Sequence, residues 1–294
     1  MQADDVLRIV ETIHGEVPSQ TAQLTGGWSG TQVWRVELAS GPHLVRIFAP
    51  RHNIVATREA AALEHGGRLG LPVSRVIARG EVGERPVLLL EWLEGRELRE
   101  ILIAEPGGAG AYGEPFGRLQ AQLHRLDSPP DLPHALDWPA RDAFPERLRS
   151  LLLDLPSRPD RFLHLDFHPA NVLVNDGEMS GLIDWTNARR GDPRFDLART
   201  WVILRVLPGL DQDTKAQSIP VVRLFVRGWH RAYRAEHGPV EGIAPFLAWA
   251  GYGLICDLGG KTADLVGEEA AKSLAVQIRE LERDTERWMA MAGL

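Results

Sequence analysis

Polar and apolar side chains alternate in residues 162–174, F-L-H-L-D-F-H-P-A-N-V-L-V. On an extended chain, this period of two places His164, Asp166 and His168 on one face. A carboxylate between two imidazoles can act as a proton acceptor, or the three groups together can bind a metal ion. Proton transfer and metal binding each need further residues elsewhere in the chain, and the residue types differ between the two.

Two further oxygen donors accompany Asp166. Asn171 follows five residues later, directly before V-L-V, and Asp184 lies in L-I-D-W beyond a turn signal at N-D-G-E. Carboxamide and carboxylate oxygens suit a hard cation such as Mg²⁺. Asp166 could then accept the proton of an attacking hydroxyl, a division of labour that phosphoryl transfer requires. A metal-dependent hydrolase that uses His164, Asp166 and His168 is the alternative.

The first ninety residues are rich in patterns that predict strands. These strands must position some of the residues that act together with Asp166. T-Q-V-W-R-V-E-L alternates like a half-buried strand, S-G-P at 40–42 indicates a turn, and H-L-V-R-I-F predicts the second strand of an antiparallel hairpin. A helix is expected over residues 53–65, closed by Gly66 and Gly67. A second pair of strands ends in P-V-L-L-L-E-W-L.

From about residue 96 the pattern becomes helical. E-P-F-G-R-L-Q-A-Q-L-H-R-L has apolar residues at helical spacing, and long helices with several tryptophans are expected beyond residue 195. Between them, F-L-H-L-D, V-L-V and G-L-I-D-W predict short strands of a hairpin. The chain is therefore expected to have an α+β fold, with a small antiparallel-sheet lobe at residues 1–93 and a mainly helical lobe at residues 94–294.

In these features the sequence resembles the aminoglycoside phosphotransferase family, a branch of the protein-kinase-like, two-lobed fold. Three motifs carry the resemblance in order: H-L-D-F-H-P-A-N, G-L-I-D-W and G-D-P-R-F-D-L-A. The resemblance implies ATP, or less readily GTP, as phosphate donor, Mg²⁺ as cofactor, and a small-molecule hydroxyl as acceptor.

The resemblance also assigns roles to residues of the three motifs. It makes the first motif the catalytic loop, with Asp166 as the base or orienting group and Asn171 as a metal ligand, and it makes Asp184 the second metal ligand. His164 would support the loop, and His168 would lie near the transferred phosphate or be a simple loop residue. Two supporting residues come from the third motif: Asp196, which would hold the loop backbone, and Asp192, for which helix cap, acceptor contact and turn remain open.

The nucleotide site expected from the resemblance departs from the family in one residue. The family carries a lysine on the strand H-L-V-R-I-F, but this chain has no lysine before Lys215, so Arg46 takes that place. Glu59 lies on the inward stripe of the predicted helix, and two charges on apolar faces are best explained if they meet. Glycines in L-T-G-G-W-S-G-T suit a phosphate-covering loop around Gly27 and Ser29, although a plain β-turn fits these residues equally well. The backbone from Glu91 to Leu93 would contact adenine.

Composition narrows the class of protein. The chain of 294 residues is 44% hydrophobic and 25% charged, as in globular proteins, and no apolar stretch is long enough to span a membrane. A net charge of −7 without a basic patch argues against a nucleic-acid partner and suits a cationic substrate. The single cysteine, Cys256, excludes disulfides and is expected to be buried, and the cytoplasm is the expected compartment. A catalytically silent nucleotide-binding protein of the same fold stays open as a second function.

Overall fold

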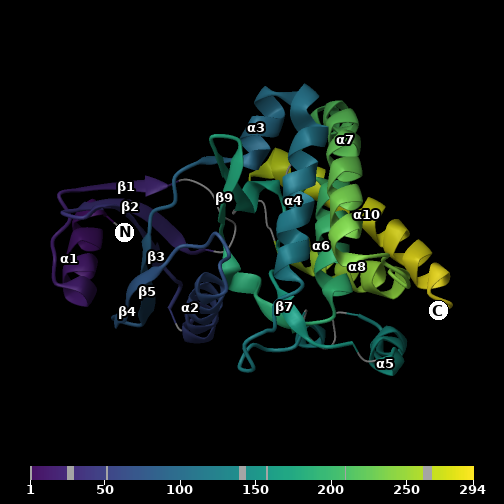
Figure 1. Ribbon diagram of the computed structural model, residues 1–294, viewed down its shortest axis with the longest axis horizontal. Coiled ribbons are helices and arrows are strands. Elements are labelled where there is room, and N and C mark those ends of the chain that lie inside the picture. Colours follow the sequence, from purple (N-terminus) through teal and green to yellow (C-terminus); the bar gives the residue numbers. More distant parts are fainter. Residues whose placement is uncertain are drawn as a thin grey trace. The chain divides into compact units, whose positions relative to one another are not determined.

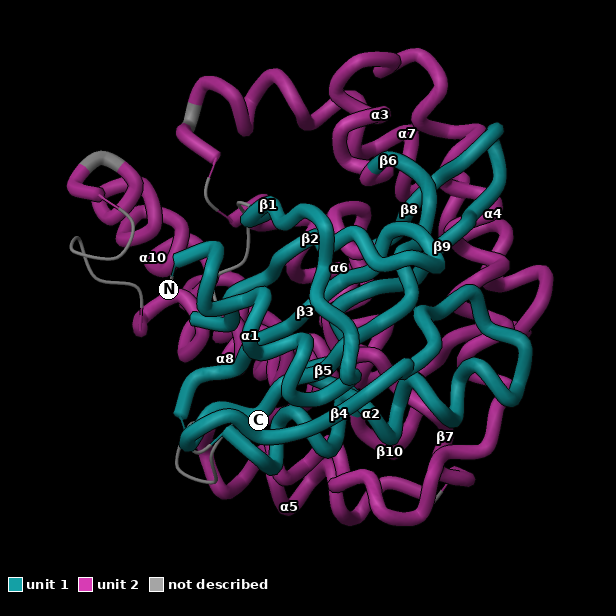
Figure 2. The backbone as a smooth tube through the Cα atoms, turned by 90° about the vertical axis from the view of Figure 1, so that its left-hand side faces the viewer, with its two compact units in different colours: residues 1–96, 172–188 teal, residues 97–171, 189–294 magenta. Residues whose placement is uncertain are grey.

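The computed structural model describes residues 2–24, 30–50, 52–138, 144–156, 158–208, 210–260 and 267–294. The chain forms two compact units, one of residues 1–96 and 172–188 and the other of residues 97–171 and 189–294. Figure 2 colours the two units separately. Their division differs from a single cut after residue 93, because the segment 172–188 returns to the first unit.

The first unit is built on a five-stranded antiparallel sheet of order β1-β2-β3-β5-β4. Its strands are β1 (Gln20–Leu24), β2 (Gln32–Leu38), β3 (Gly41–Ile47), β4 (Val76–Val82) and β5 (Arg85–Glu91). The hairpin β2–β3 and the pair β4–β5 confirm the strand predictions. β1 was not predicted, since Q-T-A-Q-L lacks apolar alternation and forms an edge strand with no buried residue.

Two helices cover the two faces of this sheet (Figure 1). Helix α1 (Ala3–His14) packs Val6, Ile9 and Val10 against the face that carries Val45 and Leu89. Helix α2 (Asn53–Arg68) lies on the face of Arg46. The prediction that Gly66 and Gly67 end α2 is wrong: the helix continues through both and the chain turns at Gly70, whose φ is 78°.

A hairpin completes the first unit. β8 (Val172–Asn175) and β9 (Glu178–Leu182) pair as predicted around a turn in which Asp176 and Gly177 both have positive φ, 49° and 82°. The two-residue strand β6 (Arg96–Glu97) adjoins β8 where the first unit ends. The short helix η5 (Trp185–Asn187) follows β9 and contacts α2.

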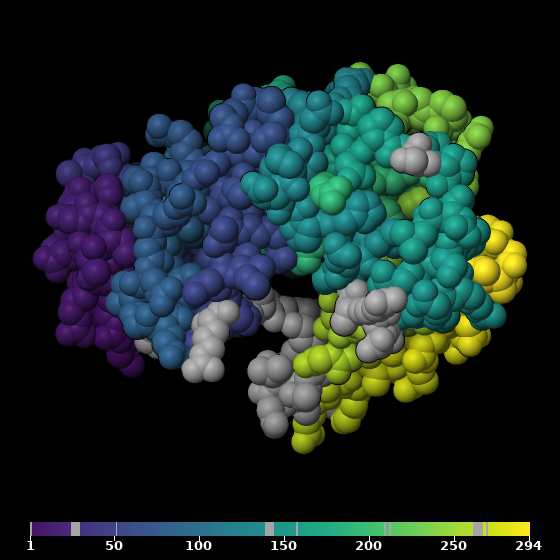
Figure 3. Space-filling view, turned by 90° about the horizontal axis from the view of Figure 1, so that it is seen from below, coloured from purple at the N-terminus to yellow at the C-terminus, as the bar shows by residue number. Residues whose placement is uncertain are grey.

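The second unit is mainly helical. Its helices are α3 (Leu98–Ala104), η1 (Pro106–Gly108), α4 (Ala109–Leu123), η2 (Ala135–Asp137), α5 (Glu146–Asp154), η4 (Pro169–Asn171), α6 (Pro193–Val206), α7 (Gln212–His237), α8 (Ala244–Gly259) and α10 (Glu268–Met291). Helices α4 and α7 run side by side, and α8 packs against α6 and α10 (Figure 1). In Figure 3 the yellow atoms of α10 and the purple atoms of α1 lie at the surface of their respective units.

The segment around Asp166 is not the strand that the alternation predicted. β7 (Arg161–Leu163) ends before His164 and pairs with β10 (Arg189–Gly191), so the chain from His164 to His168 is a loop. Leu165 and Phe167 are buried as expected, but so is His164, whereas Asp166 and His168 are partly exposed. The three polar residues therefore do not share one face.

Burial corrects the prediction for Cys256 and describes the tryptophans of the long helices. Cys256 is exposed on α8, so the prediction of a buried thiol is wrong. Trp229, Trp249 and Trp288 belong to the core, while Trp201 is 39% exposed.

None of the helices in the described residues combines the length and the apolar character that a membrane crossing requires.

Glycines let α4 and α7 approach closely. A Cβ at Gly117 would lie 2.3 Å from the Trp229 carbonyl oxygen, whereas one at Gly110, on the same helix, would lie 3.7 Å from the nearest atom, the Leu224 carbonyl oxygen. We expect Gly117→Ala to lower the free energy of unfolding by about 1–3 kcal/mol because the helices must separate. Gly110→Ala is the matched control and should change it by less than about 0.5 kcal/mol. Urea unfolding measures both; equal effects would contradict the close packing.

Candidate active site

Side chains of α6 hold the backbone of the loop around Asp166. The Asp196 carboxylate accepts hydrogen bonds from the His164 N–H at 3.3 Å and the Leu165 N–H at 2.7 Å. The Thr200 hydroxyl donates to the Phe167 carbonyl at 2.8 Å. Asp196 and Thr200 are one helical turn apart, so they lie on the same face of α6. The loop is therefore fixed from one rigid element.

A second layer of buried side chains holds those α6 residues. His124 bridges the Asp196 carboxylate, at 2.9 Å, and the Tyr233 hydroxyl, at 2.8 Å. Gln120 donates to the Thr200 hydroxyl at 2.9 Å. Gln120 lies on α4, His124 directly follows α4 and Tyr233 lies on α7, so the close packing of the two helices supports the loop.

The loop that these contacts hold contains Asp166, and the Asp166 side chain is 23% exposed. The Asn171 amide donates to the Asp166 carbonyl at 2.9 Å and to its Oδ2 at 3.2 Å. Burial alone would raise the pKa of Asp166, but the nearby His168, Arg199 and His164 hold that pKa well below its usual range. The carboxylate is thus ionised, and it is suited to orienting a hydroxyl more than to strong proton abstraction.

The two histidines have different places. His164 is buried and its Nδ1 accepts the Asp166 N–H at 3.2 Å, which supports the loop. The Nδ1 of His168 accepts the Ala170 N–H at 3.3 Å, and its Nε2 lies 3.2 Å from the Asn171 Nδ2 and 3.6 Å from Asp166 Oδ1. His168 is therefore the histidine that faces the carboxylate.

These positions do not favour the hydrolase alternative. In the described residues, no cluster of three or more His, Cys, Asp or Glu side chains is arranged to hold a metal ion. His164 is buried among loop contacts and does not join Asp166 and His168 as a third ligand.

In the first unit, Arg46 joins two carboxylates. Its Nε lies 3.2 Å from Glu59 Oε1, and its Nη2 donates to Asp184 Oδ1 at 3.2 Å. The contact between β3 and α2 expected from Arg46 and Glu59 is thus present. Their side chains are only 8% and 1% exposed, whereas the side chain of Asp184 is 29% exposed, so the contact of Arg46 with Glu59 is the buried part of this group.

Burial dominates the protonation of Glu59. Removal from water raises the pKa of Glu59 to about 7, although Arg46 opposes this rise. The neighbouring carboxylates Glu59 and Asp184 raise the pKa of Arg46 against the effect of burial, so the guanidinium stays charged. The site therefore keeps its cation at every physiological pH.

Asp184 is held in a conformation that few non-glycine residues adopt, with a φ of 61°. The Thr186 hydroxyl donates to Asp184 Oδ1 at 2.8 Å, and Arg58 donates to the Thr186 carbonyl. These contacts connect the end of β9 to α2. Both hydrogen bonds described for Asp184, from Thr186 and Arg46, go to Oδ1, which leaves Oδ2 for a cation.

The donor atoms fit an oxygen-ligated cation. The Asn171 NH₂ group is engaged with Asp166, so its carbonyl oxygen is the atom that can bind a metal. Asp184 offers a carboxylate oxygen, and Mg²⁺ accepts both kinds of ligand. Asn171 ends one segment of the second unit, and Asp184 belongs to the first unit.

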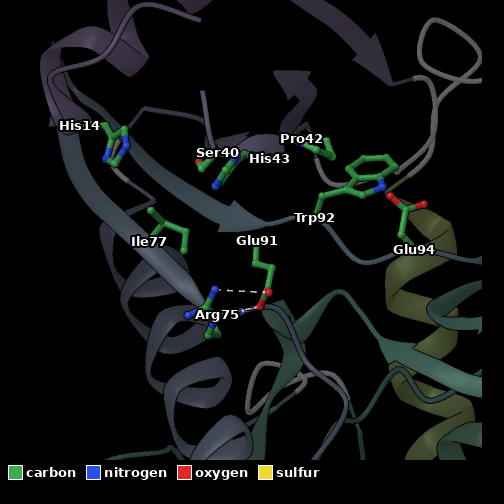
Figure 4. Close-up of a pocket in the computed structure, with 9 residues that line it drawn as sticks. All are labelled: His14, Ser40, Pro42, His43, Arg75, Ile77, Glu91, Trp92 and Glu94. Carbon is green, nitrogen blue, oxygen red and sulfur yellow. Dashed lines mark hydrogen bonds and ion pairs between the residues drawn. The ribbon is translucent and has the colours of Figure 1, made fainter. Parts of the chain in front are cut away.

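The adenine contacts expected from Glu91 and Leu93 concern their backbone. The Glu91 side chain instead points to the α1 face of the sheet, opposite Arg46, where Arg75 Nε donates to its Oε2 at 3.0 Å. It lines a pocket of about 370 Å³ with Trp92, His43 and six other residues (Figure 4). Gly27 and Ser29 lie outside the described residues.

Asp192 is a helix cap. Its Oδ1 accepts the Arg194 N–H at 2.9 Å at the start of α6, and its Oδ2 pairs with the Arg194 guanidinium at 2.7 Å. Of the three roles left open by the sequence, the structure therefore supports the cap.

Arg199, whose Nε donates to the Leu165 carbonyl at 3.1 Å, was not predicted from the sequence. Gln120 and His124 were not predicted either. The sequence does contain an indication of these residues, because polar residues on the apolar faces of α4 and α6 need buried hydrogen-bond partners. The partners lie far away in sequence, so the pairing was not readable.

Comparison with known proteins identifies the family and the fold of the chain. The model of the "Phosphotransferase enzyme family" matches residues 20–150 and 133–238. A thermostable variant of aminoglycoside phosphotransferase APH(4)-Ia, in a complex with AMP-PNP and hygromycin B, has a similar fold: TM-score 0.65, 16% identity, covering 94% of this chain and 98% of that one. Aminoglycoside-3'-phosphotransferase of type VIII gives a TM-score of 0.57 at 23% identity, covering 84% and 96%.

No curated protein matches the chain. The family match spans more than half of the sequence, and the solved structures share the five-stranded antiparallel sheet followed by a mainly helical part. The chain therefore belongs to the phosphotransferase enzyme family and has the kinase-like fold of the aminoglycoside phosphotransferases.

Proposed function

We propose that the protein transfers the γ-phosphate of ATP to a hydroxyl group of a small molecule. The observation that carries the proposal is the ionised, partly exposed Asp166 carboxylate, held by Asn171 beside it and by α6 beneath it. A fixed carboxylate that orients the nucleophile is what phosphoryl transfer asks of a protein, since its transition state is loose and needs positioning above all.

The remaining residues divide between metal and nucleotide. We assign Mg²⁺ to Asn171 and Asp184, because each keeps an oxygen for a cation; the ion would neutralise charge on the phosphates. Arg46, held by Glu59, would bind phosphate oxygens, and the backbone of Glu91 and Leu93 would bind adenine. Gly27 and Ser29 are assigned to the phosphate-covering loop by resemblance alone.

In this mechanism Asp166 accepts a hydrogen bond from the acceptor hydroxyl and aims its oxygen at the γ-phosphorus. As the bond to phosphorus forms and the bond to the ADP oxygen breaks, the hydroxyl proton passes to Asp166 Oδ1 or Oδ2. His168, whose Nε2 lies 3.6 Å from Asp166 Oδ1, helps to keep the carboxylate in its ionised form before transfer. Arg46 stabilises the charge that develops on the phosphate oxygens.

The chemical class of the acceptor is proposed from the relatives. The solved complexes of APH(4)-Ia contain hygromycin B with AMP-PNP or ADP, which supports an adenine nucleotide and a polyhydroxylated, amine-bearing acceptor. A net charge of −7 suits such a cation. ATP is supplied in the cytoplasm, so we propose that compartment.

ADP release tests the proposal. The purified protein with Mg²⁺ and ATP should release ADP faster when one member of a panel of aminoglycosides, amino sugars and simple alcohols is added, and the product should gain one phosphate by mass spectrometry. GTP in place of ATP and EDTA in place of Mg²⁺ are the controls. Calorimetric binding of Mg·ATP without transfer to any acceptor would instead indicate a silent nucleotide-binding protein.

A further inference from the structure

Leu165, directly before Asp166, has an unusual backbone conformation. It is not glycine, yet its φ is 58°, in the left-handed region, and its side chain is fully buried in the core of the second unit. A branched side chain in this conformation is strained, so surrounding contacts must hold it. The turn matters because it sets the direction of the next residue, Asp166.

Arg199 supplies the contact that completes this turn. Its Nε donates to the Leu165 carbonyl at 3.1 Å, while Asp196, three residues earlier on α6, accepts the Leu165 N–H. Both polar backbone groups of the strained residue are thus held from one face of α6. The Arg199 Nη2 also lies 4.0 Å from Asp166 Oδ1, close enough to attract the carboxylate.

Two other residues fix the guanidinium itself. The Asp257 carboxylate accepts a hydrogen bond from Arg199 Nη2 at 3.0 Å, and the Trp138 ring centroid lies 4.5 Å from the Arg199 Cζ. The side chain is only 2% exposed, so Arg199 acts through these contacts and is not placed to touch a ligand. A lysine has one nitrogen and could not contact Leu165 and Asp257 through a rigid fork.

We propose that Arg199 is a positioning residue for the Asp166 carboxylate, acting through the Leu165 carbonyl and oriented by Asp257 and Trp138. The proposal deepens the proposed function and rests on it, since Asp166 is the orienting group there. It differs from a purely structural ion pair, which would contribute to stability but leave turnover per folded molecule unchanged.

The test compares Arg199→Gln and Arg199→Lys with Arg205→Gln. Arg205 is on the same helix and pairs with Asp284 at 2.6 Å, but it is half-exposed and remote from the loop contacts. The probe is steady-state hydrolysis of Mg·ATP by the full chain, with the folded fraction measured by circular dichroism. Amide hydrogen exchange of the peptide that contains residues 164–167 is measured in parallel.

For Arg199→Gln we expect kcat per folded molecule to fall about 100-fold, with the KM for ATP within twofold of wild type, since the loop moves by an ångström or so. Arg199→Lys should recover about tenfold of this loss because it restores the charge but not the fork. Exchange at residues 164–167 should accelerate in both variants, and Arg205→Gln should match wild type in all three measurements.

Unchanged kcat in both Arg199 variants, or an equal loss in Arg205→Gln, would overturn the proposal. If wild type hydrolyses no ATP and transfers phosphate to no acceptor, the proposed function fails. Hydrogen exchange then decides alone: protection at residues 164–167 that is unaffected by Arg199→Lys would refute the positioning role.

Discussion

Replacing Asp166 with asparagine should lower kcat by about 10²–10⁴-fold. Asparagine has the same shape, so the loop contacts from Asp196 and Thr200 to the backbone remain. The variant loses the carboxylate, and with it the group that accepts the hydroxyl proton and aims the oxygen. The affinity for Mg·ATP should stay within about threefold of wild type, because Arg46 and Glu59 belong to the other unit. Turnover with an acceptor and calorimetry with Mg·ATP measure the two quantities.

Asp127→Asn is the matched control for this substitution. Asp127 pairs with Arg161 at the surface of the same unit, and its side chain is 89% exposed. Removing its charge should leave kcat and stability unchanged within error. Full turnover by Asp166→Asn with a true acceptor would remove Asp166 from its assigned role. A parallel loss in Asp127→Asn would mean that the assay reports a general effect of charge.

The sequence predicted the parts of the site that lie close together along the chain. Asp166 and Asn171 are five residues apart, so one loop suffices to join them, and alternation in T-Q-V-W-R-V-E-L predicted β2. The contact of Arg46 with Glu59 was also predictable, since a buried charge needs a partner and each chain segment offered one.

Structural features that depend on contacts between distant parts of the chain were not predicted. The alternation at His164 to His168 indicated a strand, but Asp196 and Arg199 bend this segment into a loop with Leu165 in the left-handed region. The identical alternation of polar and apolar residues fits both structures, and only the contacts from α6 decide between them. Periodicity cannot reveal such contacts, because their partners lie about thirty residues away.

Arg46→Met should cause the largest loss of stability among the variants considered. It leaves the Glu59 carboxyl, 1% exposed, without its cation, and above pH 7, where wild-type Glu59 is ionised, breaking this buried ion pair from one side should cost about 3–5 kcal/mol. The size of the loss should depend on pH. Below pH 7 Glu59 holds a proton in both proteins, since burial raises the pKa of Glu59 to about 7 even beside Arg46.

Above pH 7 the two proteins diverge. Wild-type Glu59 ionises and its contribution stops changing, because Arg46 stabilises the carboxylate. Without Arg46 the pKa of Glu59 rises further, so the folded variant keeps a proton that its unfolded chain releases. Each additional pH unit should then add up to about 1.4 kcal/mol to the destabilisation, until the higher pKa is reached. Urea unfolding at intervals between pH 6 and 9 measures this slope.

Two variants test whether Glu59 is the cause. Arg46→Met combined with Glu59→Gln removes the titrating group, so its destabilisation relative to Glu59→Gln should not change across this pH range. Arg35→Met serves as a control on the same sheet, because Arg35 pairs with Glu37 at 2.7 Å but is 44% exposed; it should cost about 0–1 kcal/mol. If the slope persists in the double variant, another group titrates, and Glu59 is not the buried acid that Arg46 neutralises.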